Sequence, residues 1–225
     1  MTSTPIDVWN AASFDEALFA KLHGNEALVR DYLTTRQRQF QEQEASGGHI
    51  LVQENEYGQD FQAFVEDIGR DMNSRIIRAW HYTRLGDDEL RLMRSHGLHT
   101  STLDGLRRRL DARVKAGAFS IEIADALYAA SPIHHQPTRA GKFYMASEPV
   151  PIDDRGVTRL LGNWGGEGTY FWLKDEALEK VVASVGRPRV LEIAVPVAST
   201  SHWYHAEKRR DICFRAQPWP KDGSG

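Results

Sequence analysis

The change in side-chain pattern near residue 76 is the feature of this sequence that most constrains its fold. Before it, leucines such as Leu18, Leu22 and Leu28 recur at helical spacing. Residues 76–82 are instead rich in β-branched and aromatic side chains, which is typical of a strand. Strand-like runs then alternate with charged helical segments. The sequence therefore predicts an α+β fold, in which a helical region precedes a mixed sheet with inserted helices.

We divide the chain into a helical N-terminal region (1–73), an α+β domain (74–221) and a flexible tail (222–225). In the first region, Ser13 and Glu16 form a capping-box pattern, Ser46–Gly48 breaks the helix, and a second helix is expected over 59–73. In the domain, strands are expected at 76–82, 98–101, 142–147, 169–173, 190–197 and 211–215, and helical segments at 87–95, 103–114, 120–130, 157–161 and 175–184.

Composition excludes several classes of protein. The formal net charge of −3 gives no strong attraction to nucleic acid. The single cysteine, Cys213, cannot form a disulfide within the chain or a thiolate metal site, and it fits a reducing compartment. No signal-peptide pattern and no long apolar run occur. We therefore expect a cytoplasmic protein without a membrane partner, or an effector exported without an N-terminal signal.

Common catalytic patterns are also missing from the sequence. Its histidines show no spacing that would hold a metal ion together with a carboxylate, so we expect no metal; those considered are His96, His99, His134 and His135. Neither Cys213 nor any serine lies in a nucleophile-elbow motif. These absences argue against metal-dependent hydrolysis and against nucleophilic catalysis.

The segment His81-Tyr82-Thr83-Arg84 lies where the first predicted strand ends and a turn begins. Histidine and threonine side chains can both exchange hydrogen bonds with a sugar hydroxyl. A strand-end histidine can equally be satisfied by the backbone, so the segment alone leaves both interpretations open.

A second candidate is the glycine-rich segment Gly162–Gly168, which contains Trp164, Gly165 and Glu167. Glycines permit close approach of the backbone to a ligand, the tryptophan can stack, and the carboxylate can act as an acceptor or base. The segment matches neither a P-loop nor a dinucleotide fingerprint. The alternative is a tight connection between two strands.

Two further segments each place aromatic residues after a glycine at the start of a strand, and they contain Tyr144 and Tyr170. Either ring could stack on a planar heterocycle, and either could belong to the core.

Together these segments resemble the His-Tyr-Glu class of ADP-ribosyltransferases. The resemblance lies in His81 with Thr83, the helix ending at Gly97-Leu98, the later aromatic strand and the carboxylate. That class includes diphtheria-toxin-like and poly-ADP-ribose-polymerase-like enzymes. The resemblance covers about residues 76–200 and is loose. The chain is also similar to a group of uncharacterised bacterial proteins that share the His-Tyr-Thr-Arg and Trp-Gly-Gly-Glu segments.

The resemblance implies an ADP-ribosyltransferase-like catalytic domain that uses NAD as substrate and modifies a protein or nucleic acid, as a toxin, effector or regulator. It assigns the ribose hydroxyls to His81 and makes Glu167 the catalytic carboxylate, which would stabilise the oxocarbenium-like transition state. The remaining residues that it places around NAD are Tyr82, Thr83, Arg84, Tyr144, Trp164, Gly165 and Tyr170.

Three alternatives stay open at this stage. In such enzymes the carboxylate commonly lies on a late strand, where this chain offers Glu207 and Asp211. Tyr144 and Tyr170 compete as the ring that stacks on nicotinamide. The domain could also be a catalytically inactive module that binds a nucleotide or a protein, with its N-terminal helices as the docking surface. For an active enzyme, the partners considered include an inhibitory protein.

Overall fold

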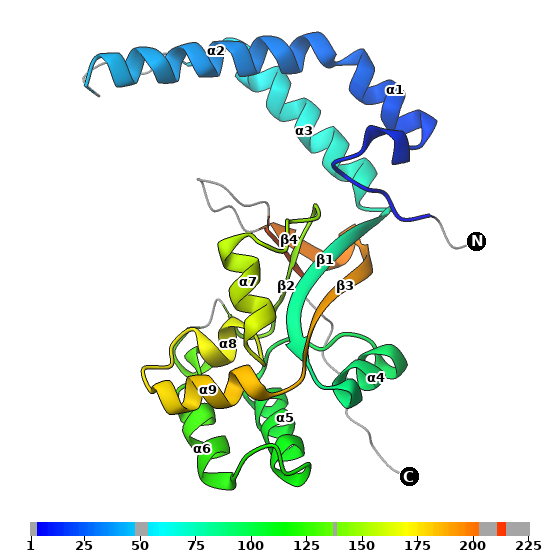
Figure 1. Cartoon of the computed structure of the whole chain (residues 1–225). Helices are drawn as coiled ribbons and strands as arrows, with labels where there is room; N and C mark the ends of the chain where they lie inside the picture. The colour runs from blue at the N-terminus through cyan, green and yellow to red at the C-terminus, as the bar shows by residue number, and fades with distance from the viewer. Residues whose placement is uncertain (1–3, 48–53, 137–138, 203–210, 215–225) are drawn as a thin grey trace. The chain divides into compact units, whose positions relative to one another are not determined.

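The structure is a computed structural model, and it describes residues 4–47, 54–136, 139–202 and 211–214. These residues belong to two compact units, which we describe separately (Figure 1). Unit 1 comprises Met1–Ile77 with Pro196–Ala198, and unit 2 comprises Arg78–Val195 with Ser199–Gly225. The division falls inside the first strand, since Ile77 and Arg78 are consecutive residues of that strand.

Unit 1 is helical, as predicted. Its α-helices are α1 (Glu16–Gly24), α2 (Glu26–Ala45) and α3 (Gly58–Met72), preceded by a 3-10 helix over Ala11–Ser13. The predicted cap at Ser13 is wrong, because Asp15 accepts the hydrogen bond from the Leu18 N–H instead. The Ser13 hydroxyl bonds to the backbone of its own turn. The charged side chain that directly precedes the helix is therefore its cap.

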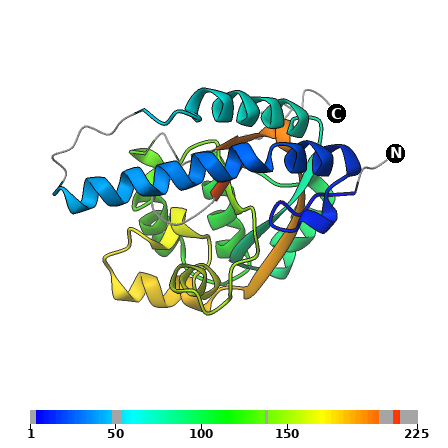
Figure 2. The same ribbon diagram turned by 90° about the horizontal axis from the view of Figure 1, so that it is seen from above.

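Few side chains hold unit 1 together. The rings of Tyr32 on α2 and Phe61 on α3 stack at a centroid distance of 3.8 Å, and the two helices lie side by side (Figures 1 and 2). Lys21 on α1 reaches both Asp67 and Asp71 on α3, at 2.7 and 2.6 Å. These ion pairs join the first helix to the third.

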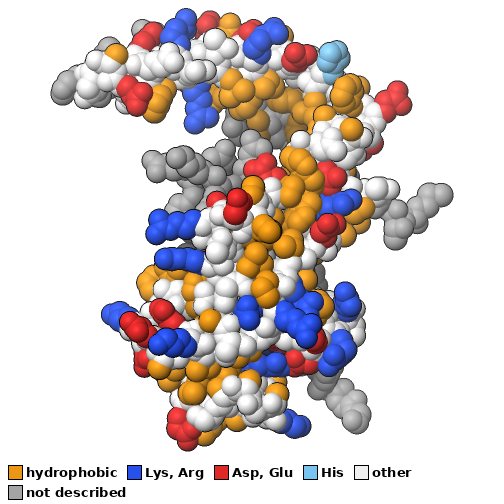
Figure 3. Space-filling view, viewed as in Figure 1, with side chains coloured by type: hydrophobic (Ala, Val, Ile, Leu, Met, Phe, Trp, Pro, Cys, Tyr) orange, Lys and Arg blue, Asp and Glu red, His pale blue; other side chains and the backbone are white. Residues whose placement is uncertain are grey.

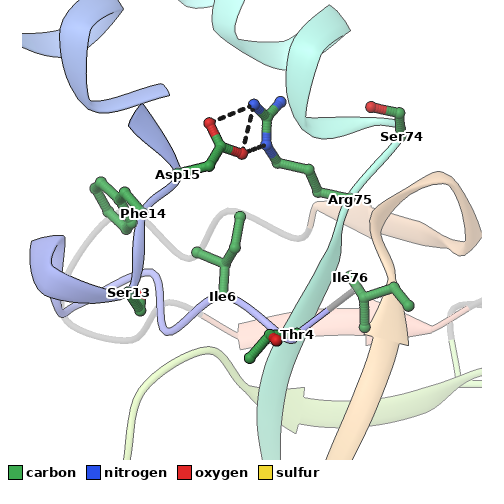
Figure 4. Close-up of a pocket in the computed structure, with 8 residues that line it drawn as sticks. All are labelled: Thr4, Ile6, Ser13, Phe14, Asp15, Ser74, Arg75 and Ile76. Atoms are coloured by element: carbon green, nitrogen blue, oxygen red, sulfur yellow. Dashed lines mark hydrogen bonds and ion pairs between the residues drawn. The ribbon is translucent and has the colours of Figure 1, made fainter. Parts of the chain in front are cut away.

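The start of the chain closes the unit beside the end of α3. Ile6 donates its N–H to the Ile76 carbonyl at 2.9 Å, and it is almost fully buried. Arg75 makes two hydrogen bonds to the Asp15 carboxylate, at 2.9 and 3.0 Å, which lowers the pKa of Asp15. A cavity of about 280 Å³ lies between these residues (Figure 4).

Unit 2 is built on a five-stranded sheet with the order β3-β1-β2-β5-β4. The ladders β1–β2, β2–β5 and β4–β5 are antiparallel. These three ladders do not decide whether the whole sheet is mixed, as we predicted. The strands are β1 (Ile76–Leu85), β2 (Phe143–Ala146), β3 (Arg187–Pro196), β4 (Thr200–His202) and β5 (Asp211–Phe214). The sheet thus pairs strands that lie far apart in sequence.

Helices connect these strands, and α5 and α6 pack as a pair at one end of the unit (Figure 1). The α-helices are α4 (Asp87–His96), α5 (Leu103–Lys115), α6 (Ile121–Ala129), α7 (Arg155–Gly162), α8 (Glu167–Tyr170) and α9 (Glu176–Ser184), with 3-10 turns at Pro132–His134 and Val197–Ser199. The predicted end of α4 at Gly97 is confirmed, because this glycine has a φ of +82°.

Three local predictions are wrong. Residues 83–85 continue β1 instead of turning, so His81 lies inside a strand. Residues 98–101 form no strand and only one bridge, Ser101↔Lys142. Residues 169–173 are not a strand, because α8 covers Glu167–Tyr170. Two glycines with positive φ redirect the chain before α8, and burial of Tyr170 then outweighs the β-propensity of the aromatic run.

Two apolar clusters form the core of unit 2. The larger one joins α5, α6 and α9 around Trp164, which has no exposed surface. The smaller one packs Trp80 and Tyr82 of β1 against Val157 of α7. The two faces of β1 are therefore used differently, and this difference places the candidate site.

Candidate functional site

Side chains on β1 alternate between the two faces of the sheet, as in any strand. Trp80 and Tyr82 face α7, together with Ala146 of β2. His81 points the other way, and its ring lies 4.3 Å from that of Phe143, also on β2. Tyr144 follows Phe143 directly, so the alternation places it on the same face as Tyr82. The structure therefore does not bring the rings of His81 and Tyr144 together on one face.

His81 is held in one tautomer. Its Nδ1 lies 2.9 Å from the carbonyl oxygen of Tyr144, which can only accept, so Nδ1 carries the proton. Nε2 is then left as a hydrogen-bond acceptor, and within the described residues no hydrogen bond to it is found. Burial lowers the pKa of His81 to about 4, against the opposing effect of the Tyr144 carbonyl, and the positive charge of Arg109 lowers it further. The imidazole is therefore neutral at pH 7.

The other three residues of the segment support the fold. The Tyr82 hydroxyl donates to the Val150 carbonyl at 2.9 Å and accepts from the Val150 N–H at 2.6 Å. Thr83 is almost fully buried. Arg84 donates its Nε–H to the Val185 carbonyl at 2.8 Å, and its terminal guanidinium nitrogens have no partner in the described part of the chain.

Trp164 is completely buried and donates a hydrogen bond to a buried carboxylate. Its Nε1–H donates to Glu89 at 2.7 Å, and Glu89 also accepts from the Gly86 N–H at 2.9 Å and from Arg109 Nε at 2.8 Å. The Arg109 guanidinium lies over the Trp164 ring, 4.8 Å from its centre. Trp164 thus positions Glu89 and Arg109 and offers no open face to a ligand.

Glu89 and its neighbours are the residues that the sequence analysis missed. Three successive acidic residues open α4, and each pairs with an arginine from elsewhere in unit 2: Asp87 with Arg189, Asp88 with Arg113, and Glu89 with Arg109. Burial opposes ionisation of Glu89, but the charge of Arg109 and the hydrogen bonds from Gly86 and Trp164 lower its pKa overall. The acidic run Asp87–Glu89 and the arginines of α5 were visible in the sequence, but their pairing was not.

Arg109 links this cluster to His81. Its side chain retains about a third of its exposure, at 35%. Only its Nε is engaged by an acceptor among the described residues, which leaves the terminal nitrogens available. Its charge also reaches His81, as the lowered pKa of that residue shows. Unit 2 therefore combines a neutral acceptor on His81 with a partly exposed cation on Arg109 whose charge reaches it.

Glu167 contacts other residues than His81 and Arg109. It is the first residue of α8, its side chain is 47% exposed, and it forms an ion pair of 3.0 Å with Arg139. Gly165, with a φ of +85°, packs against Thr169, where an added Cβ would lie 2.2 Å from the threonine hydroxyl oxygen. The conformation of Gly165 is therefore required for the turn into α8. The competing carboxylate Glu207 lies outside the described residues.

Tyr170 belongs to the larger core cluster and is almost fully buried. Burial and the negative charge of Glu167 raise the pKa of its hydroxyl to about 12. Tyr144 is half-buried on β2 and contributes its carbonyl to His81. The His81 ring packs against the ring of Phe143.

Comparisons with protein-family models, with curated proteins and with solved structures gave no match for this chain. Within the part of the chain that the structure describes, no group of three or more His, Cys, Asp or Glu side chains could hold a metal ion. No described helix is both long enough and apolar enough to cross a bilayer. The contacts described above define the candidate site as His81 and Arg109, with Glu167 as a separate, exposed carboxylate.

Proposed function

We propose that this protein is a mono-ADP-ribosyltransferase that uses NAD and transfers ADP-ribose to a macromolecular acceptor. One observation carries the proposal: His81 has a fixed tautomer whose acceptor nitrogen has no partner among the described residues, and the charge of the partly exposed Arg109 reaches it. A ribose hydroxyl can donate to such a nitrogen, and a guanidinium is suited to a pyrophosphate. NAD carries both groups.

Chemistry in this proposal depends on Glu167. When the bond between nicotinamide and ribose breaks, positive charge develops on the ribose, and a nearby carboxylate stabilises it. Glu167 has a side-chain exposure of 47%, so it can meet a substrate. Tyr144 supports the site by fixing the tautomer of His81 through its backbone, so its ring is not required for that role.

Labelled NAD tests the proposal directly. The protein is incubated with NAD labelled in the adenylate half and with a cell lysate, and both label transfer and nicotinamide release are measured. We expect His81→Ala to lose NAD binding, and Glu167→Gln to keep binding while losing transfer. If the unaltered protein neither binds NAD nor releases nicotinamide, the proposal is refuted.

The second candidate is a transferase-like module that binds a nucleotide without reacting. It is favoured by the ion pair between Glu167 and Arg139, because a carboxylate engaged in this way is not free to face a ribose. NAD binding without nicotinamide release, unchanged in Glu167→Gln, would establish this alternative.

A further inference from the structure

A small aromatic and acidic niche in unit 2 already holds a guanidinium group. The Arg139 guanidinium makes the 3.0 Å ion pair with Glu167, and it lies over the ring of Trp172, 5.9 Å from the ring centre. Its Nε donates to Gln136 at 2.7 Å. A carboxylate beside an aromatic face is the environment that guanidinium groups prefer in proteins.

The niche is open to solvent, unlike the pair of Glu89 with Arg109, whose carboxylate is buried. Glu167 has a side-chain exposure of 47%, and Trp172 and its neighbour Phe171 are 41% and 47% exposed. The two rings meet edge to face at 5.2 Å. Figure 3 shows acidic and basic side chains together in the region of α8 and α9. Adjacent exposed aromatic rings of this size are uncommon on a protein surface that binds nothing.

Arg139 is also a weakly held occupant. Exposed ion pairs contribute little to stability, so an external group of the same chemistry can replace an internal one at small cost. In the described part of the chain, the side-chain contacts of Arg139 are those with Glu167, Gln136 and the Trp172 ring. An incoming guanidinium would meet the same carboxylate and the same ring.

We propose that Glu167 and Trp172 form a binding site for an arginine side chain of a partner protein, and that Arg139 occupies this site until the partner displaces it. The binding step is independent of the proposed function. For transfer, the inference rests on that function and names the acceptor: a guanidine nitrogen forms the bond to the ribose carbon as nicotinamide leaves with the electrons of the broken bond, and the proton lost from the guanidinium passes to solvent or to Glu167.

Agmatine, which carries a guanidinium, is the probe, and 1,4-diaminobutane is its ammonium counterpart. Binding is measured by calorimetry to the full chain. We expect Arg139→Gln to bind agmatine about fivefold more tightly than the unaltered protein, because the internal competitor is gone. Trp172→Leu and Glu167→Gln, each combined with Arg139→Gln, should reduce that affinity at least fivefold.

Arg159→Gln is the matched control. Arg159 is an exposed arginine whose charge also reaches Tyr170, yet it has no contact with Glu167 or Trp172 among the described residues. Its substitution should leave agmatine affinity unchanged. Equal affinity for the diamine, no gain in Arg139→Gln, or the same gain in Arg159→Gln would each overturn the inference.

Transfer separates this inference from the proposed function. With labelled NAD and agmatine, Arg139→Gln should label agmatine at a higher rate than the unaltered protein. Nicotinamide release without labelled agmatine would refute the arginine acceptor and leave the transferase in place. Agmatine binding without nicotinamide release would refute the transferase and leave the arginine-binding site in place.

Discussion

Replacing His81 tests the site through stability, without any ligand. In the folded chain its pKa is about 4, against 6.5 for an ordinary histidine. Between pH 6.5 and pH 4, His81 is therefore protonated in the unfolded chain but neutral in the folded chain. The free energy of unfolding falls as the pH drops through this range. Below pH 4 both states are protonated and the loss from this group is complete.

The size of this effect follows from the two pKa values. Between pH 7 and pH 5, His81 alone should lower the free energy of unfolding of unit 2 by about 2 kcal/mol, and the full loss at lower pH is about 3 kcal/mol. Asp88 and Glu89 have lowered pKa values, so their contribution is lost at more acidic pH. A comparison of pH 7 with pH 5 therefore separates the histidines from these carboxylates. His99 also has a pKa lowered by burial, so the contribution of His81 is taken from the difference between the unaltered protein and a His81 variant.

The assay is urea unfolding followed by tryptophan fluorescence, which reports on the buried Trp80 and Trp164. His81→Gln keeps an N–H donor for the Tyr144 carbonyl but has no proton to gain, so its loss between pH 7 and pH 5 should be about 2 kcal/mol smaller. His135→Gln, at an exposed position of unit 2, is the control and should behave as the unaltered protein does. If His81→Gln loses as much stability as the unaltered protein, the environment assigned to His81 is wrong.

Four other substitutions test the packing of unit 2, each by urea unfolding at pH 7. Gly186→Ala should cost about 3 kcal/mol or more, because φ is +69° and the new Cβ would lie 2.4 Å from a backbone carbon of β1, whereas Gly97→Ala, with positive φ but open space, should cost about 1 kcal/mol. Tyr82→Phe should cost about 1–2 kcal/mol, since its two backbone partners lose their shared hydroxyl; an unchanged value would mean that water replaces it. Glu89→Gln should cost about 2 kcal/mol, between the values typical of exposed and buried ion pairs, and a stability equal to that of the unaltered protein would show that Arg109 finds another partner.

Local patterns in the sequence predicted most elements of the fold. The helix ending at Gly97, the paired helices on either side of Gly117 and the strand at 142–147 were all expected. Each depends on nearby residues: a glycine stop, a helical period or aromatic residues that follow a glycine. The strand order was not predicted, because it depends on contacts between residues far apart in sequence. The same limit explains why 169–173 was assigned to a strand, since burial of Tyr170 among distant residues contributes to its conformation.

The candidate site shows the same division. His81 was predicted from its own segment, but the sequence could not reveal that its partners are the Tyr144 carbonyl and the Arg109 charge. Trp164 was expected to face a ligand, and the structure instead buries it against Glu89. Nothing near Trp164 in the sequence identifies Glu89, which lies 75 positions away.

The position of β5 affects how the protein folds during synthesis. This strand follows the other described elements in the chain, yet it lies inside the sheet, between β2 and β4. After residues 143–146 leave the ribosome, several seconds pass before residues 211–214 are made. Throughout that interval one edge of β2 has no native neighbour and can pair with another nascent chain. A slow codon stretch between the two strands should therefore lower the yield of folded protein, even though it changes no amino acid.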